Sequence, residues 1–348
     1  MKKINEINQI LLFILIVFVL LYFGSPFLVP FVFGVFFASL MAPFSNFLEK
    51  HKINRVFSSL ISTMVIFIVT GIVLYITMLQ INRFVLEIPD IRYEIQNEFE
   101  NIQKRIASAT DLSVDEQREL WQNRSPNIIG IIEAGLTRFL GDVVNIAGGF
   151  LLVLVYLFLL LYYRSKFKDS FLMFMSNEKK KKAEDILEEI SEIVYHYLWG
   201  RVKVMAILAI LYYITFLIFD LPYAGLLTIF GALITIIPYL GPFLSGILPI
   251  IFAIFYLPGF SLIILFTVII IIIQLTESYV FEPVIIGHEV KINPLIVIIA
   301  IMMGAMIWGL AGMILFVPVF AVLKIIADHS PSLKPVGYFL GSSSKSRS

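Results

Sequence analysis

A small group of polar side chains follows one of the most apolar stretches of the chain, and it offers the clearest candidate chemistry. Gln274 and Glu277 lie three residues apart, so on a helix they share one face, and Glu282 follows shortly after. A carboxylate at the centre of a bilayer costs about 2.5–3.5 kcal/mol on insertion scales, so one retained there usually faces protein or water. Glu277 is therefore a candidate ion- or proton-coupling group. The alternative is an interfacial glutamate near the headgroups, because Glu277 lies near the end of its apolar run.

The element that must position these groups is a broken apolar hairpin from Leu221 to Tyr256. Pro238, Gly241 and Pro242 divide it into two arms of about 16 residues, each roughly 24 Å long as a helix and short of a ~30 Å hydrocarbon core. Non-helical backbone is tolerated at membrane depth only where protein buries it or water reaches it, and broken segments often line transport sites. We expect a re-entrant or cavity-lining hairpin. The alternative is a tight turn between two short spans at the membrane surface.

The composition places this hairpin in a membrane protein. Of the 348 residues, 59% are hydrophobic and 15% are charged, against about 25% charged in soluble chains. The mean hydropathy is +0.93. We predict an all-α polytopic membrane protein with about eight membrane segments, the broken hairpin included. The first apolar run has no small-residue cleavage site after it, so it is expected to be a retained span.

Several other chemistries are not expected. The chain has no cysteine, which excludes disulfides and thiolate metal sites, and its four histidines are scattered. It contains neither a G-x-x-x-x-G-K-[ST] loop nor an H-E-x-x-H motif. The net charge of +1 gives no indication of a nucleic-acid partner. We therefore predict no enzyme, no cofactor and no metal site.

The chain divides into five predicted regions. Between the N-terminal and later spans lies the most polar stretch, in which Ile91, Ile95, Phe99 and Ile102 follow helical spacing, so an amphipathic helix outside the bilayer is expected. The regions are N-terminal spans (1–81), extracytoplasmic or interfacial amphipathic helices (82–149), a span with a basic cytoplasmic region (150–204), a C-terminal transport core (205–327) and a disordered tail (328–348).

Orientation follows from the basic residues beside the spans. With an even number of crossings, the N-terminal lysines, the 50–55 loop, the 164–203 region, the Lys291 loop and the Lys324 tail all fall on one side. We therefore expect cytoplasmic N- and C-termini. The region 82–127 then lies outside.

The combined motifs resemble one known family. Ile237-Pro-Tyr-Leu-Gly-Pro242, Gln274-Leu-Thr-Glu277 and Glu282-Pro283-Val-Ile-Ile-Gly287 match, in order, the pattern of the autoinducer-2 exporter family of bacterial membrane proteins. The last part of the pattern, from Gly309 to Pro318, matches as well. The resemblance covers the whole chain and is densest from Tyr197 onward.

The resemblance implies a multi-pass secondary transporter of the bacterial cytoplasmic membrane, and a homo-oligomer, a pentamer in the family's known architecture. It places Pro238, Gly241, Pro242, Gln274, Glu277, Glu282, Pro283 and Gly287 along the substrate or ion path. Some relatives are regarded as autoinducer-2 exporters and others as sodium/proton antiporters. Two residues depart from the pattern: Arg201 stands where many relatives have glutamine, and Ser278 where many have asparagine.

Three functional hypotheses stay open from the sequence. The first is export of a small polar solute along the hairpin and the 274–283 segment, with Glu277 handling any driving ion. The second is a sodium/proton antiporter that uses the same carboxylate for monovalent cations alone. The third is a non-transporting membrane scaffold that acts through the outer region. In each case the surrounding lipid is an expected partner.

Overall fold

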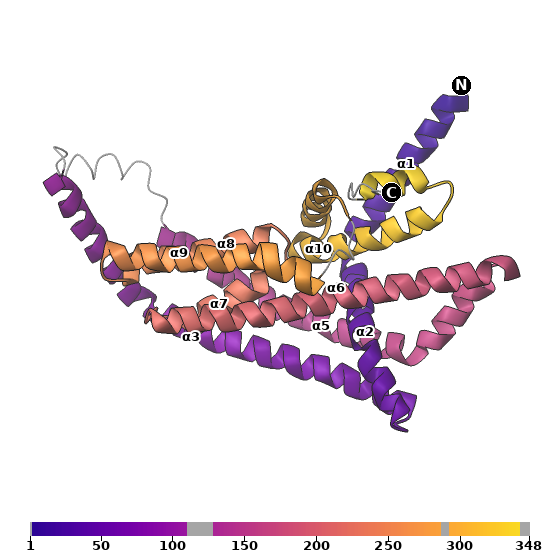
Figure 1. The fold of residues 1–348 in the computed structure, drawn as a ribbon, viewed down its shortest axis with the longest axis horizontal. Helices are drawn as coiled ribbons and strands as arrows, with labels where there is room; N and C mark the ends of the chain where they lie inside the picture. The colour runs from indigo at the N-terminus through magenta and orange to yellow at the C-terminus, as the bar shows by residue number, and fades with distance from the viewer. Residues whose placement is uncertain (1, 110–127, 287–291, 342–348) are drawn as a thin grey trace.

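The computed structural model describes residues 2–109, 128–286 and 292–341, and it is built from helices (Figure 1). Within these residues six helices are long and apolar enough to cross a membrane, and three shorter apolar helices accompany them. The predicted all-α polytopic class is thus confirmed. The number of actual crossings stays a prediction.

The N-terminal half contains four helices: α1 (Lys2–Phe23), α2 (Ser25–Lys50), α3 (Arg55–Ala109) and α5 (Ile128–Met173). Gly34 lets α2 approach α5 closely, because a Cβ there would lie 2.6 Å from Cβ of Tyr156. The hydroxyl groups of Ser45 and Ser58 join α2 to α3 across 2.7 Å. Hydrogen bonds between small polar residues of this type tie membrane helices together.

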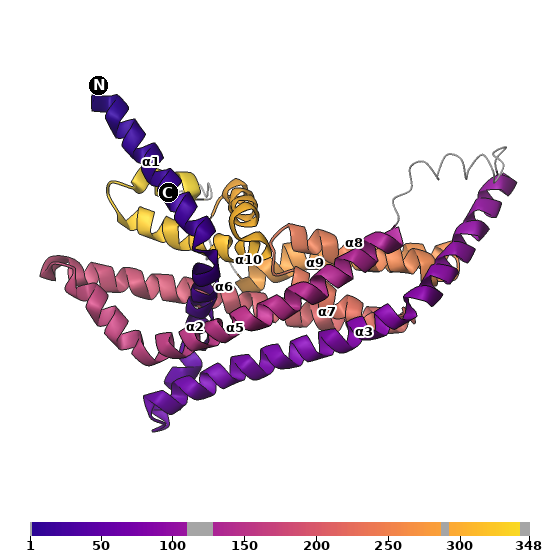
Figure 2. The same cartoon turned by 180° about the vertical axis from the view of Figure 1, so that it is seen from behind.

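The polar outer region is continuous with the spans. The predicted region of N-terminal spans ends at residue 81, but α3 runs on without a break to Ala109. Helix α5 then begins at Ile128. Figure 2 shows α3 extending past the other helices at one end of the molecule. A change in polarity therefore marks where a helix changes its surroundings, without ending the helix.

Helix α6 (Asn177–Ile218) is the central helix of the C-terminal half. Val204, Leu208, Tyr212 and Phe216 recur at four-residue intervals and are fully buried, so one face of α6 supplies much of the main core. The opposite, N-terminal part of the same helix carries the predicted basic segment with Lys179 to Lys182. One helix thus links the charged region to the buried core of the C-terminal half.

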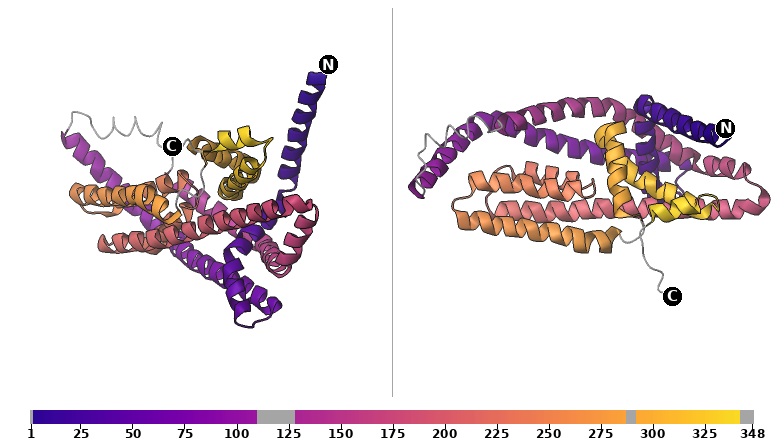
Figure 3. Two further views of the ribbon diagram at one scale, coloured as in Figure 1. Left: turned by 45° about the vertical axis from the view of Figure 1, so that its right-hand side comes forward. Right: turned by 90° about the horizontal axis from the view of Figure 1, so that it is seen from above.

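The broken hairpin forms α7 (Ala224–Ile234) and α8 (Leu240–Tyr256), and it is followed by α9 (Phe260–Thr276) and the π-helix η1 (Glu277–Ile286). In Figure 3 the hairpin, α6 and α9 run side by side, and α7 packs on α6 while α8 packs on α9. The first arm, α7, begins shortly after the end of α6, and the second arm, α8, ends shortly before the start of α9. The chain therefore enters and leaves the hairpin at one end of the bundle.

The last long helix, α10 (Pro294–His329), consists of two arms. At Gly309 the backbone leaves the helical region with φ 59° and ψ −137°, and Gly304 and Gly312 on the two sides of this kink meet backbone to backbone. Only residues without a side chain permit so close a crossing.

The predicted disordered tail is wrong for its described part. Helix α10 continues to His329, and α11 (Lys334–Leu340) packs back onto it. Leu340 is buried, and its carbonyl oxygen accepts a hydrogen bond from the Asn293 amide at 2.9 Å. In the sequence, the serines that follow indicated a disordered tail, and the apolar residues Val336 and Leu340 were too few to predict a packed helix. Residues 342–348 lie outside the described chain.

Candidate functional site

The hairpin tip depends on two of the predicted site residues. A Cβ at Gly241 would overlap the carbonyl oxygen of Ile234, so only glycine lets α8 start against the end of α7. Pro238 and Gly241 are both buried. Tyr239 between them has φ 63°, a conformation that is costly for a residue with a side chain. The turn is therefore a strained backbone segment held by its surroundings, and Tyr239 leaves 55% of its surface exposed.

A buried arginine clamps this tip to the neighbouring helices. Arg201 on α6 is only 5% exposed, and its Nη1 donates to Oε1 of Glu282 on η1 at 2.6 Å. The same nitrogen donates to the carbonyl oxygen of Thr235, next to the end of α7, at 3.4 Å. The guanidinium also lies 5.8 Å from the ring centroid of Tyr197. One side chain thus contacts the hairpin and η1 at once.

Close packing of α6 on η1 makes this clamp possible. A Cβ at Gly200 would lie 3.0 Å from Cγ1 and 3.1 Å from Cα of Ile286, so the glycine beside Arg201 brings the two backbones together. The charge-assisted bond that results is short and directional. Arg201 therefore fixes where η1 lies relative to the hairpin tip.

Glu277, the predicted coupling carboxylate, is enclosed by protein. Its side chain is 0% exposed, and neither carboxylate oxygen has a hydrogen-bond partner among the described residues. A buried carboxylate without partners is costly when charged and is stabilised by a proton or a cation. The location of Glu277 inside the protein fits an ion-handling group better than an interfacial glutamate.

The π-helical register brings the two glutamates of η1 together. Residues five apart lie about one turn apart in a π-helix, whereas in an α-helix they point about 140° apart. Pro283 lies inside η1 and has no amide hydrogen for an ordinary α-helical bond. Glu277 and Glu282 therefore share one side of η1, the first unpaired and the second bound by Arg201.

A polar bridge crosses the bundle beside Glu277. Nε2 of Gln274 donates to the hydroxyl of Tyr212 at 2.8 Å and to that of Ser245 at 2.9 Å. Ser245 lies one turn after Pro242, and its hydroxyl donates to the Pro242 carbonyl at 3.1 Å. The side-chain amide of Gln274 packs directly against Gly246, where a Cβ would lie 3.1 Å from its Nε2. Oε1 of Gln274 is buried without a partner among the described residues, on the same face as Glu277.

The structure thus brings together seven of the eight predicted site residues, and their roles stay predictions. Gly287 lies outside the described residues. Sequence reasoning did not include Arg201, Tyr212, Ser245 or Thr235 in the path. The sequence did contain a signal for Arg201, because an arginine next to the apolar run of a span needs a partner for its charge. No sequence pattern pairs Tyr212 with Gln274, because that contact depends on how the helices pack.

Comparison with known proteins identifies the family. Residues 11–332 match the family described as AI-2E family transporter. The chain belongs to this family. The AI-2 transport protein TqsA of Escherichia coli is 23% identical over 327 residues, which cover 93% of this chain and 92% of TqsA. YueF of Bacillus subtilis, named for transport without a stated cargo, is 27% identical over 91% of this chain and 90% of its own length.

A third relative matches a shorter part. YrrI of Bacillus subtilis, also named for transport alone, is 31% identical over 150 residues, which cover 43% of this chain and 42% of YrrI. The family and the apolar helices together show a multi-pass membrane transporter.

Proposed function

We propose that this transporter is a secondary exporter of a small polar organic solute, such as autoinducer-2, in the bacterial cytoplasmic membrane. The observation that carries the proposal is the Glu277 carboxylate, fully buried and without a partner among the described residues, in a π-helix whose next turn is clamped to the hairpin tip. TqsA is named for AI-2 transport, which supports this cargo class. The cargo crosses without chemical change, so no enzymatic step is proposed.

In this mechanism Glu277 takes up and releases the driving ion. Neutralisation of Glu277 by a proton or a cation removes the cost of its buried charge, and its release restores that cost. Because Glu277 and Glu282 belong to one π-helix, a shift of η1 that exposes Glu277 also moves the partner of Arg201. The hairpin tip, bound by the same arginine, then moves relative to α6 and opens the path to the other side.

A sodium/proton antiporter is the second candidate, and one observation favours it. Oε1 of Gln274 and both carboxylate oxygens of Glu277 are buried and find no partner in the described part of the chain. Three such oxygens are suitable ligands for a small cation without any organic cargo. The scaffold hypothesis has no such support, because the chain belongs to a transporter family.

Flux measurements in proteoliposomes distinguish these functions. We expect movement of labelled autoinducer-2 together with a proton or sodium ion, and we expect Glu277→Gln to abolish the coupled ion flux. Glu188→Gln is the matched control, because the Glu188 side chain is 70% exposed and lies on the charged part of α6. Sodium-dependent proton flux without solute would favour the antiporter. Unchanged coupled flux in Glu277→Gln would show that another group handles the ion.

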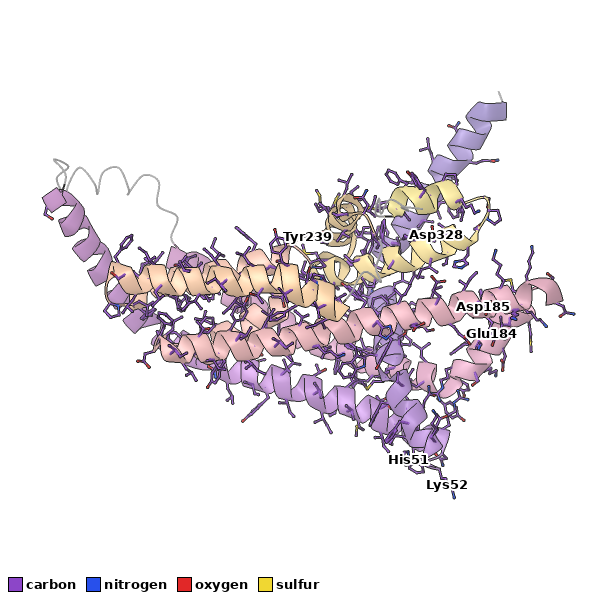
Figure 4. The ribbon with its side chains drawn as sticks, viewed as in Figure 1. His51, Lys52, Glu184, Asp185, Tyr239 and Asp328 are labelled. Atoms are coloured by element: carbon purple, nitrogen blue, oxygen red, sulfur yellow. The ribbon has the colours of Figure 1, made fainter. Side chains whose placement is uncertain are left out.

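We also propose the orientation that the basic residues predict, with cytoplasmic termini. In Figure 4 the labelled ionisable residues His51, Lys52, Glu184, Asp185 and Asp328 all lie in the half of the molecule that also holds α1 and α11. The base of the hairpin lies at the opposite end. A homo-oligomer, which the family resemblance implies, is part of the same proposal, and chemical cross-linking in native membranes tests it.

A further inference from the structure

A cavity of about 660 Å³ lies at the base of the hairpin, away from the tip and its clamp. It opens where α3, α6 and α7 meet, and Gln80, Tyr213, Gly225 and Thr228 contribute to its lining. Its volume falls within the range of small-molecule sites, about 300–1,000 Å³. Neither the motif at the hairpin tip nor Glu277 belongs to its described lining.

Thr228 lines this cavity and carries a buried hydroxyl group that is not used within its helix. Threonines within helices usually donate to the carbonyl four residues earlier, as Thr63, Thr77, Thr215 and Thr276 do in this chain. Thr228 is only 7% exposed, yet its Oγ1 has no partner among the described residues. Rotation about the Cα–Cβ bond exchanges the hydroxyl with the methyl group, and a ligand in the cavity can offer the enclosed Oγ1 the partner that the described residues do not.

The start of α7 adds hydrogen-bond donors to the same cavity. Ala224 and Gly225 form the first turn of this 11-residue helix and line the cavity, and no side chain caps the helix. The first amide groups of a helix lack partners within it, and the helix dipole makes this end partly positive. Acceptor oxygens of a solute are therefore favoured here.

Gln80 supplies an amide that can both donate and accept. Its Nε2 would lie 2.7 Å from a Cβ at Gly225, so the amide rests directly on the glycine at the start of α7. None of the described residues that line this cavity is charged. A bare metal or alkali cation finds no carboxylate here, whereas a molecule with several hydroxyl or carbonyl oxygens finds donors and acceptors on three helices.

We propose that this cavity binds a small, oxygen-rich organic solute without positive charge. The inference rests on the proposed export function and deepens it, because it gives the path a solute site separate from the ion-handling group. Helix α7 connects the two: it begins at the cavity and ends beside Thr235, whose carbonyl accepts from Arg201. Occupancy at the hairpin base is thereby coupled to the clamp at the tip.

Thiol labelling tests the site directly, because the chain contains no cysteine and each introduced thiol is unique. We expect Thr228→Cys in detergent-solubilised protein to react with a water-soluble methanethiosulfonate. Autoinducer-2 or D-ribose should slow the reaction, and sodium chloride at equal ionic strength should not. Thr215→Cys is the matched control, since Thr215 is equally buried on α6 but does not line the cavity.

Calorimetry of binding on two glycine variants gives a second readout. Gly225→Ala pushes the Gln80 amide aside and should raise the Kd about fivefold, the effect of losing one net hydrogen bond. Gly71→Ala on α3 should leave the Kd unchanged, because nothing lies within 4 Å of a Cβ there. Equal Kd values in the two glycine variants would overturn the proposal. Labelling of Thr228→Cys by lipid-soluble reagents alone would also overturn it, because that result indicates a groove filled by lipid. Binding without transport in proteoliposomes would overturn the export function and leave the site standing.

Discussion

At the scale of single residues, the site is defined by how its buried polar groups are paired. Arg201 is bound to Glu282 and to the Thr235 carbonyl, whereas Glu277 one turn away has no partner among the described residues. The cost of a buried charge depends on such pairing. Glu282 of η1 therefore stabilises the contact with α6, and Glu277 is the group that we propose to bind the ion.

The clamp predicts a measurable loss of stability in Arg201→Gln, because this change removes the charged partner of Glu282. Removing one partner of a buried pair costs about 3–5 kcal/mol, and we expect about 1–3 kcal/mol here because the Glu282 side chain is 32% exposed to water. The melting temperature in detergent should fall accordingly. Lys168→Gln, which breaks a surface pair with Glu184, should change stability by about 0–1 kcal/mol.

A double variant separates the pair from simple packing. If Arg201 and Glu282 act as a pair, Glu282→Gln should cost much less in the Arg201→Gln background than in the unaltered chain. Additive losses would mean that Arg201 stabilises the fold through its contacts with Tyr197 and Thr235 instead.

The polar bridge predicts a smaller effect for Gln274→Leu. The change removes two hydrogen bonds, but the hydroxyls of Tyr212 and Ser245 stay 3.2 Å apart and can still bond each other. We expect a loss of about 1–2 kcal/mol in the free energy of unfolding, since one net hydrogen bond contributes about 1 kcal/mol. Thermal melts should show it, with Thr276→Val within about 0.5 kcal/mol as the control at an outward-facing position. No change in Gln274→Leu would mean that the bridge does not stabilise the helix packing.

At the scale of elements, the hairpin was predictable and the π-helix was not. Pro238, Gly241 and Pro242 interrupt an apolar run, and each acts locally on the backbone, so the break is visible in the sequence. The register of η1 depends on packing against α6 at Gly200 and on Pro283 together. Pro283 alone predicts a helix end. The long α3 was missed for a related reason, because helix continuity does not follow polarity.

The hairpin turn predicts that Gly241→Ala abolishes transport. The new Cβ would overlap the Ile234 carbonyl and lie 2.5 Å from Cα of Thr235, and both are backbone atoms that cannot rotate away. The tip must then open, which separates Thr235 from Arg201. We expect loss of solute flux and a lower melting temperature, whereas Gly71→Ala on α3 should keep both. Normal flux in Gly241→Ala would show that the tip geometry does not control the path.

At the scale of the whole molecule, the distribution of charge could be predicted and the arrangement of the C-terminus could not. The basic stretches that predicted orientation fall on the 51–54 turn and on the N-terminal part of α6, which Figure 4 shows in the same half of the molecule. This agreement follows because Lys and Arg remain outside the hydrocarbon region wherever helices pack. The docking of α11 onto α10 depends on a few contacts, such as that between Asn293 and Leu340, which composition does not reveal.

Orientation itself is the final prediction, and the absence of cysteine makes it directly measurable. Single variants His51→Cys, Asp185→Cys and Ser332→Cys place a thiol at exposed positions of the charged half, and Pro258→Cys places one at the exposed connection after the hairpin. In intact cells a membrane-impermeant maleimide should label Pro258→Cys alone, because the re-entrant hairpin begins and ends at the outer face. The other three should react only after the membrane is permeabilised. Labelling of Pro258→Cys and His51→Cys from the same side would contradict both the proposed orientation and the assignment of the bundle's two ends to opposite faces of the membrane.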